Sequence, residues 1–283
     1  MALTDYQMQI GDLILGPGTD YIVTLPPELG GPTMRVSDSE KPQEHGVYYG
    51  PDLYDARMFV LGVTVRGDDP SDTLVNTDAL IEEWQVDSRY NTSVTKPLRV
   101  KFPGKIEVQL HGRPRRALLP TTRLIGNRST GSMEYHAGDP AWYSVTEYST
   151  ALGLSVQAGG FGFPMTFPLQ FGGTASGASA IITNGGNFQT KPNVTFTGPF
   201  NNPRIENVTT GEILELDLII ASGDYVEVDF ANATIMLNGT ASRYYSKVGP
   251  FWTLESGDNE VRIGSGSYDA ASAATIYWRD AWI

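Results

Sequence analysis

Residues 211–239, GEILELDLIIASGDYVEVDFANATIMLNG, alternate apolar and polar side chains in three short runs. Alternation with a period of two places one face of an extended strand in a core and the other in solvent. Ser222-Gly223-Asp224 follows the first run and Asn238-Gly239 ends the third, and such residues supply the positive φ angles that hairpin turns require. The stretch therefore predicts antiparallel strands at 213–220, 224–230 and 234–239.

The same alternation recurs on either side of this stretch. In the second half it predicts further strands at 193–198, 204–209, 259–264 and 274–279. Short strands at a spacing of about 8 to 12 residues are typical of a β-sandwich. The first half predicts strands at 8–15, 20–25, 57–66, 97–102, 105–111, 116–125 and 132–136. The fold class is therefore mainly β.

One segment departs from the strand pattern. PSDTLVNTDALIEEWQVD, residues 70–87, offers Ser71 or Asp72 as an N-cap and places Leu80, Ile81 and Trp84 at helical spacing. We expect an α-helix at about 71–87 that packs on a sheet. Trp84 then belongs to the core, which is where an apolar helical stripe normally lies.

The chain of 283 residues is long enough for two domains. Residues 152–190 are rich in Gly, Ser, Ala, Pro and Phe and carry no charge, and the run FPMTFPLQF repeats Phe and Pro every four residues. Because proline excludes a regular helix, this run predicts an extended segment. We expect a first domain at 1–155, a Phe/Pro/Gly-rich junction at 156–190 and a second domain at 191–283.

The net charge of −12 argues against a general nucleic-acid binder, since such a surface repels phosphate. The charges are also segregated. Residues 1–95 hold 5 basic and 16 acidic side chains, whereas residues 96–128 hold 9 basic and 1 acidic. Either the two segments pair or face solvent within one subunit, or they form complementary contacts between neighbouring subunits. The second alternative makes Arg113, Arg115 and Arg116 candidate interface residues.

The sequence contains no pattern of catalytic, metal or cofactor chemistry. It has no cysteine, and His45, His111 and His136 each lack the nearby second ligand of a metal motif. It also lacks a nucleophile elbow, a phosphate-binding loop, a dinucleotide fingerprint and an EF-hand loop. We therefore expect no enzyme activity, no metal and no cofactor.

The chain shows neither a secretion signal nor a membrane segment. Asp5 and Asp12 stand where a signal peptide would carry positive charge, and its apolar runs are shorter than the roughly 20 residues that cross a bilayer. We expect no membrane insertion.

Aromatic residues of the second half leave a binding function open, because such rings can stack on sugars. The set is Tyr244, Tyr245, Phe251, Trp252, Tyr277, Trp278 and Trp282. Alternation around Trp252 and Trp278 predicts that these two point into a sandwich core. A β-sandwich that binds carbohydrate on a cell surface is the alternative function.

An ordered set of motifs resembles a known family. It comprises YYGPDLYDARMFVLGVTVRG (48–67), GDPAWYS (138–144), FPLQF (167–171), PNVTFTGP (192–199), NPRIENVTTGE (202–212) and WRDAW (278–282). In this order they resemble the distal tail proteins of siphophages, most closely the tail components of phages that infect actinobacteria.

The resemblance implies a structural virion protein of the tail tip, made in the host cytoplasm. Its first domain is expected to be a β-sandwich or split barrel with one helix, which forms a hexameric ring, and its second a galectin-like β-sandwich. The resemblance further implies that the ring joins the tail tube protein to tail-tip and tail-associated proteins and that DNA passes through its channel without specific binding. Likeness to galectins in fold transfers no sugar-binding residues.

Overall fold

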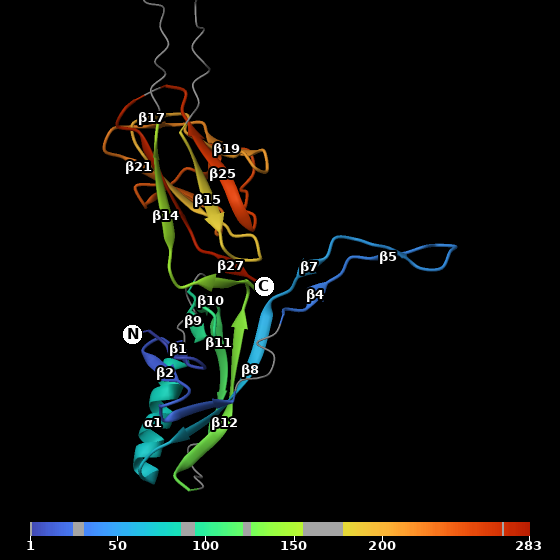
Figure 1. The fold of residues 1–283 in the computed structure, drawn as a ribbon, viewed down its shortest axis with the longest axis vertical. Helices are drawn as coiled ribbons and strands as arrows, with labels where there is room; N and C mark the ends of the chain where they lie inside the picture. The colour runs from blue at the N-terminus through green and yellow to red at the C-terminus, as the bar shows by residue number, and fades with distance from the viewer. Residues whose placement is uncertain (1, 25–30, 86–93, 121–125, 155–177, 268) are drawn as a thin grey trace, which may run out of the picture. The chain divides into compact units, whose positions relative to one another are not determined.

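The structure is a computed structural model that describes residues 2–24, 31–85, 94–120, 126–154, 178–267 and 269–283. The chain divides into two compact units, Met1–Val145 and Thr146–Trp282. Figure 1 shows that both are built mainly from strands, which confirms the mainly β fold class. The Phe/Pro run of the expected junction lies outside the described residues.

Unit 1 holds two sheets and the helix. One sheet has the order β2–β1–β9–β10–β13 within this unit, and the other has the order β11–β12–β8–β3. Its strands are β1 (Met8–Ile10), β2 (Leu13–Leu15), β3 (Tyr21–Thr24), β4 (Met34–Arg35), β5 (Ser39–Glu40), β6 (Val47–Tyr48), β7 (Leu53–Tyr54), β8 (Arg57–Arg66), β9 (Leu98–Lys101), β10 (Glu107–Leu110), β11 (Arg113–Leu118), β12 (Arg128–Ala137) and β13 (Trp142–Ser144). All their ladders are antiparallel.

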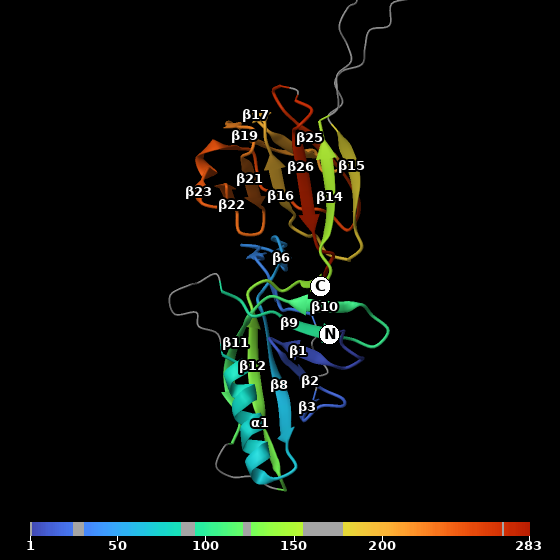
Figure 2. The ribbon, with the colours of Figure 1, turned by 90° about the vertical axis from the view of Figure 1, so that its left-hand side faces the viewer.

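The helix α1 (Pro70–Glu83) packs on β8 and β12, as Figure 2 shows. The predicted stripe is largely confirmed, because Leu80 and Trp84 are buried, although Ile81 is only half-buried. The expected N-cap was wrong. The cap is Asp69, whose side chain accepts a hydrogen bond from the Asp72 amide, and Pro70 occupies the first turn, where its missing N–H is not needed.

Two strand predictions in unit 1 need correction. The single strand expected at 8–15 is a hairpin of β1 and β2, because Gly11 turns the chain with a φ of +53°. The strand expected at 116–125 begins earlier, at Arg113, because residues 113 and 114 pair with β12. Its last residues, 121–125, lie outside the described part of the chain.

Unit 2 is a sandwich of two antiparallel sheets, with the orders β14–β26–β16–β21–β22–β23 and β15–β25–β18–β19–β24. Its strands are β14 (Tyr148–Gly153), β15 (Ser179–Asn184), β16 (Asn193–Thr197), β17 (Phe200–Asn201), β18 (Arg204–Asn207), β19 (Glu212–Leu216), β20 (Ile219–Ile220), β21 (Tyr225–Asp229), β22 (Thr234–Leu237), β23 (Ala241–Ser242), β24 (Lys247–Val248), β25 (Gly257–Gly264), β26 (Ala273–Trp278) and β27 (Ala281–Trp282), with a 3-10 turn at Tyr244–Ser246. Thus residues 148–153, expected in the first domain, pair with β26 in unit 2.

The predicted alternation builds the core of unit 2. Along β21, Val226 and Val228 are buried while their neighbours are not, and both belong to one continuous apolar cluster between the sheets. The turn residues Gly223, Asn238 and Gly239 have positive φ, as expected. The strand expected at 213–220 is two strands in different sheets, because residues 217 and 218, between β19 and β20, are not in a strand.

Candidate assembly site

Within the basic residues 96–128, the three candidate arginines lie on β11, which is an edge strand with a bulge. β11 ends one side of its sheet and pairs with β12. The register jumps from Pro114 opposite Tyr135 to Ala117 opposite Met133. Two arginines, at 115 and 116, therefore stand opposite the single residue Glu134. A bulge of this kind bends an edge and re-aims its side chains.

The structure separates the three arginines that the sequence grouped together. Arg113 is half-buried, and its Nε donates a hydrogen bond to the Val94 carbonyl at 2.7 Å. Arg115 and Arg116 are exposed, and within the described chain neither is engaged in a hydrogen bond or an ion pair. Arg113 therefore helps to fix the strand, whereas its two neighbours present positive charge to the outside.

Tyr135 holds β12 in place directly behind the bulge. Its ring is fully buried, and its hydroxyl lies 2.7 Å from the Lys96 carbonyl and 2.9 Å from the Leu110 carbonyl. Leu110 belongs to β10, so this contact ties the two sheets of unit 1 together. Burial raises the pKa of the Tyr135 phenol well above its usual value, because a phenolate would lose its hydration there.

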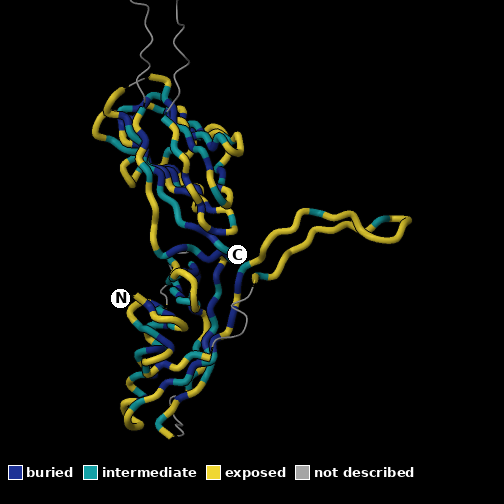
Figure 3. Tube along the Cα trace, viewed as in Figure 1, coloured by how far each residue is buried: buried dark blue, intermediate teal, exposed yellow. Residues whose placement is uncertain are grey.

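Residues 31–56, which we call the arm, form a long hairpin between β3 and β8. Figures 1 and 3 show the arm extending away from the sheets of unit 1 with most of its length exposed. Its exposed large apolar side chains are Met34, Val36, Val47, Tyr48, Tyr49, Leu53 and Tyr54, and Tyr49 is 90% exposed. So many apolar side chains in one exposed segment indicate a contact surface.

Short ladders hold the arm together. β4 pairs with β7 and β5 pairs with β6, each over two residues, and the Gly50 amide donates to Asp38 Oδ1 at 3.0 Å. An isolated two-stranded hairpin is marginally stable in water. The arm is therefore a segment that a partner surface would stabilise.

The arm is also acidic. It carries five carboxylates, at positions 38, 40, 44, 52 and 55, and two basic side chains, Arg35 and Lys41, which leaves a net charge of −3. Lys41 is already engaged, since its Nζ lies 3.8 Å from Glu44 Oε2 and 5.3 Å from the ring centre of Tyr48. In the sequence, the arm is marked only by a run without core alternation, rich in Pro, Gly, Tyr and acids.

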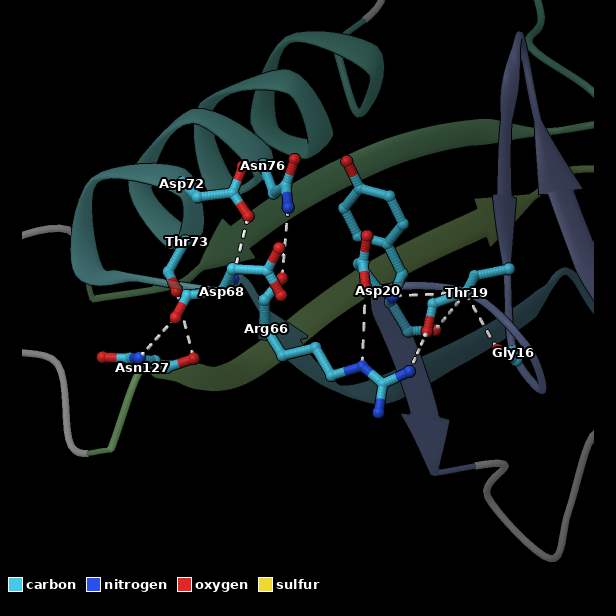
Figure 4. A network of polar contacts seen from close by, with 10 residues as sticks. Gly16, Thr19, Asp20, Arg66, Asp68, Asp72, Thr73, Asn76 and Asn127 are labelled. Atoms are coloured by element: carbon cyan, nitrogen blue, oxygen red, sulfur yellow. Dashed lines mark hydrogen bonds and ion pairs between the residues drawn. The ribbon is translucent and has the colours of Figure 1, made fainter.

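Asp68, Asp69 and Asp72 form a second acidic group at the start of α1, and their contacts lie within unit 1 (Figure 4). Asp72 Oδ2 accepts a hydrogen bond from the Asp68 amide at 2.9 Å, and Asn127 Nδ2 donates to the Asp68 carbonyl at 2.9 Å. Arg66 Nε lies 3.5 Å from Asp20 Oδ1. The first two contacts join the segments that flank β8 and β12 to the start of the helix, and the ion pair joins the end of β8 to the start of β3. In the described part of the chain, no cluster of three His, Cys, Asp or Glu side chains is arranged to hold a metal ion.

The histidines lie apart from one another. His45 is exposed on the arm, His111 Nε2 lies 3.2 Å from Gln109 Nε2, and His136 stands opposite Met58 in the sheet. The described chain also contains no helix whose length and hydropathy would suit a bilayer span.

The aromatic side chains of unit 2 divide into core and surface groups. Trp252 is 2% exposed, which confirms its predicted inward position. Trp278 is half-buried, and its Nε1 donates to the Thr183 carbonyl at 3.1 Å. Tyr244 and Tyr245 are exposed, and the ring of Tyr244 stacks on Phe251 with centres 6.3 Å apart.

Comparison with known proteins agrees with this architecture. Residues 185–282 match the family model of the siphovirus-type tail component, C-terminal domain. A search of curated proteins found no match. Residues 185–282 of unit 2 are therefore similar to the C-terminal domain of siphovirus-type tail components. This match confirms the resemblance drawn from the sequence.

Solved structures with a similar fold align over nearly the whole chain. SPP1 Dit, described as a hub of the adsorption apparatus in phages that infect Gram-positive bacteria, aligns with a TM-score of 0.66 and 12% identity over 99% of this chain and 100% of its own. A chain of the phage P2 baseplate in its activated conformation with Ca aligns with a TM-score of 0.54 and 9% identity over 97% of this chain and 98% of its own. The chain therefore shares the fold of SPP1 Dit.

Proposed function

We propose that this protein assembles as a hexameric ring at the tail tip, which joins the tail tube to the adsorption apparatus and leaves a channel for DNA. The observation that carries the proposal is the arm, whose apolar side chains its own unit does not cover. A segment of this kind requires a surface on another molecule. The fold shared with SPP1 Dit, a hub protein by its description, supports a position at the tail tip.

Contacts between copies would be heterologous. The arm leaves unit 1 before β8, whereas the arginine bulge lies on β11 at the edge of the sheet opposite β3. Different surfaces on one subunit that bind each other in sequence generate a ring when the rotation closes. Arg113, Arg115 and Arg116 belong to this interface in our proposal, with Arg113 fixing the strand and the other two meeting acidic surface.

The charge distribution also suits a channel for DNA. A lumen lined by arginine would bind phosphates and slow the passage of the genome. We therefore place the arginine bulge away from the lumen and acidic or neutral side chains toward it, so that DNA passes without specific binding.

The test is the mass and symmetry of the protein in assembled tails. We expect a sixfold ring continuous with the tube, and we expect Arg115→Glu/Arg116→Glu to leave the monomer folded but to reduce incorporation into tails. A protein present in one or two copies per particle would contradict the ring. Normal incorporation of this double variant would contradict the interface.

A second candidate function applies to unit 2, because the structure leaves Tyr245 82% exposed next to Tyr244. Exposed aromatic rings can stack on sugars, so this pair is the candidate carbohydrate contact. Retention of the protein on purified host cell-wall polysaccharide should fall in Tyr244→Ala/Tyr245→Ala and stay unchanged in Ile181→Ala, which alters a similarly exposed position. Equal retention of all three proteins would exclude this role.

A further inference from the structure

We propose that the arm of one copy docks on the arginine bulge of the next copy, so that its carboxylates face Arg115 and Arg116. The inference rests on the proposed ring and identifies the acidic surface that these arginines meet. Its basis is that the arm carries exposed acid and aromatic side chains, whereas the bulge carries exposed arginines that have no partner in the described chain.

The arm is long enough to reach a neighbouring subunit. From its base at residue 31 to its tip near Glu44, an extended chain covers about 40 Å at roughly 3.3 Å per residue. A sheet of four strands is about 15 Å wide, because neighbouring strands lie roughly 4.8 Å apart. The arm therefore exceeds the width of its own sheet, and Figure 1 shows it leaving that sheet.

The two surfaces match in chemistry as well as in charge. The planar fork of arginine binds carboxylates with two hydrogen bonds and also stacks on aromatic faces. The arm offers both groups, with the carboxylates of Glu40 and Asp52 and the exposed ring of Tyr49. Beside the bulge, Leu118 is 46% exposed and can cover an apolar side chain of the arm.

Two features favour the bulge over the nearby basic residues Lys96 and Arg99. Lys96 and Arg99 are already paired, with Lys96 Nζ 2.6 Å from Glu83 Oε1 and Arg99 Nη2 2.5 Å from Glu107 Oε1. The bulge also interrupts the regular ladder of the edge, which disfavours simple addition of another strand and favours docking through side chains.

The absence of cysteine from the chain permits a selective cross-linking test. Tyr49→Cys is labelled with a maleimide benzophenone, mixed with copies labelled uniformly with 15N, and irradiated as full-length protein in assembled tails. Digestion after glutamate leaves β11 within the fragment Val108–Glu134. We expect cross-links between unlabelled and 15N peptides that join the arm to this fragment. Ile181→Cys, with a side chain 70% exposed in unit 2, is the control label and should give none to it.

Charge exchange tests the same contact by a second route. Arg115→Glu/Arg116→Glu should lower the yield of cross-links to residues 108–134, summed over the shorter peptides that the two new glutamates create, by about tenfold, because several weak ion pairs become repulsive together. Adding Glu40→Arg/Asp52→Arg in the arm should restore most of the yield. Lys191→Glu/Arg243→Glu, which changes the net charge equally in unit 2, should leave it unchanged.

The outcomes separate this inference from the ring itself. Rings whose Tyr49 label reaches only its own copy, another tail protein or another surface of the neighbour would overturn the docking while leaving the proposed function intact. Arms that reach the bulge equally well after charge reversal would overturn the role of Arg115 and Arg116. A protein that forms no oligomer in tails would overturn both proposals.

Discussion

Replacing Tyr135 by phenylalanine tests how the sheets of unit 1 are held together behind the bulge. The change removes only the hydroxyl, which lies 2.7 Å and 2.9 Å from the carbonyls of Lys96 and Leu110. The ring remains, and so do its contacts with Phe59 and Trp84, whose ring centres lie 5.5 Å and 6.1 Å away. Any loss of stability therefore reports the hydroxyl alone.

The expected loss follows from the geometry. The hydroxyl has a single proton to share between two carbonyls, and its removal leaves buried acceptors without that donor, which costs about 1 to 3 kcal/mol. No large cavity forms, since one oxygen is lost from a close-packed site. We expect unit 1 to lose about 1.5 kcal/mol of unfolding free energy. This value is near the lower end of that range, because the Lys96 carbonyl is only partly buried. This corresponds to a fall of about 3 to 6 °C in its Tm.

Calorimetry of the full chain measures this effect if the two units melt separately. The transition that shifts must belong to unit 1, and the other should not move. Tyr148→Phe is the matched control, since its side chain is 39% exposed in unit 2, and it should change either transition by less than about 0.5 kcal/mol. An unchanged unit 1 transition in Tyr135→Phe would refute the argument that this hydroxyl ties the sheets.

Three further predictions concern pH, domain boundaries and the helix cap. Burial raises the pKa of the Tyr135 and Tyr143 phenols, and the nearby Asp139 carboxylate raises that of Tyr143 further, so the folded state holds both protons more tightly than the unfolded state does. The unfolding free energy of unit 1, measured by urea titration from pH 8 to 11, should therefore be constant below about pH 10 and fall as the pH rises further. A fragment of residues 146–282 should be more stable to heat than one of 190–283, which lacks the core residues of β14 and β15. Asp69→Ala should cost unit 1 about 1 kcal/mol in urea unfolding, and Asp78→Ala, at an exposed helical position, much less.

Strands that alternate over their whole length were predictable from the sequence. β8 spans Arg57–Arg66 as predicted, because its buried and outward residues alternate without a break through ten positions. The strands of unit 2 follow for the same reason, and their alternating apolar residues meet in one core. Period-two burial is a local property, so a single sequence is enough to reveal it.

Features that depend on one backbone angle or on distant pairing were not predictable. The hairpin at Gly11 looks like continuous alternation, because Met8, Ile10, Leu13 and Leu15 fit a strand pattern on either side of it. The cap at Asp69 was missed because Asp69, Ser71 and Asp72 are all acceptable caps, and only Pro70 decides between them. The bulge at Arg115 and Arg116 exists only relative to β12. The position of an edge strand such as β14 is likewise set by its pairing with a strand far along the chain, here β26.

The arm changes how the charge segregation is to be understood. The sequence suggested that the acidic excess of residues 1–95 faces basic residues 96–128, either within a subunit or between subunits. In the structure, five of those sixteen acids lie on the arm, and another group lies at the start of α1, where its contacts are internal. The acids therefore do not form one face. Those at the helix start make contacts that stabilise unit 1. On the arm, the side chains of Glu40 and Asp52 are exposed and can meet Arg115 and Arg116 of another copy.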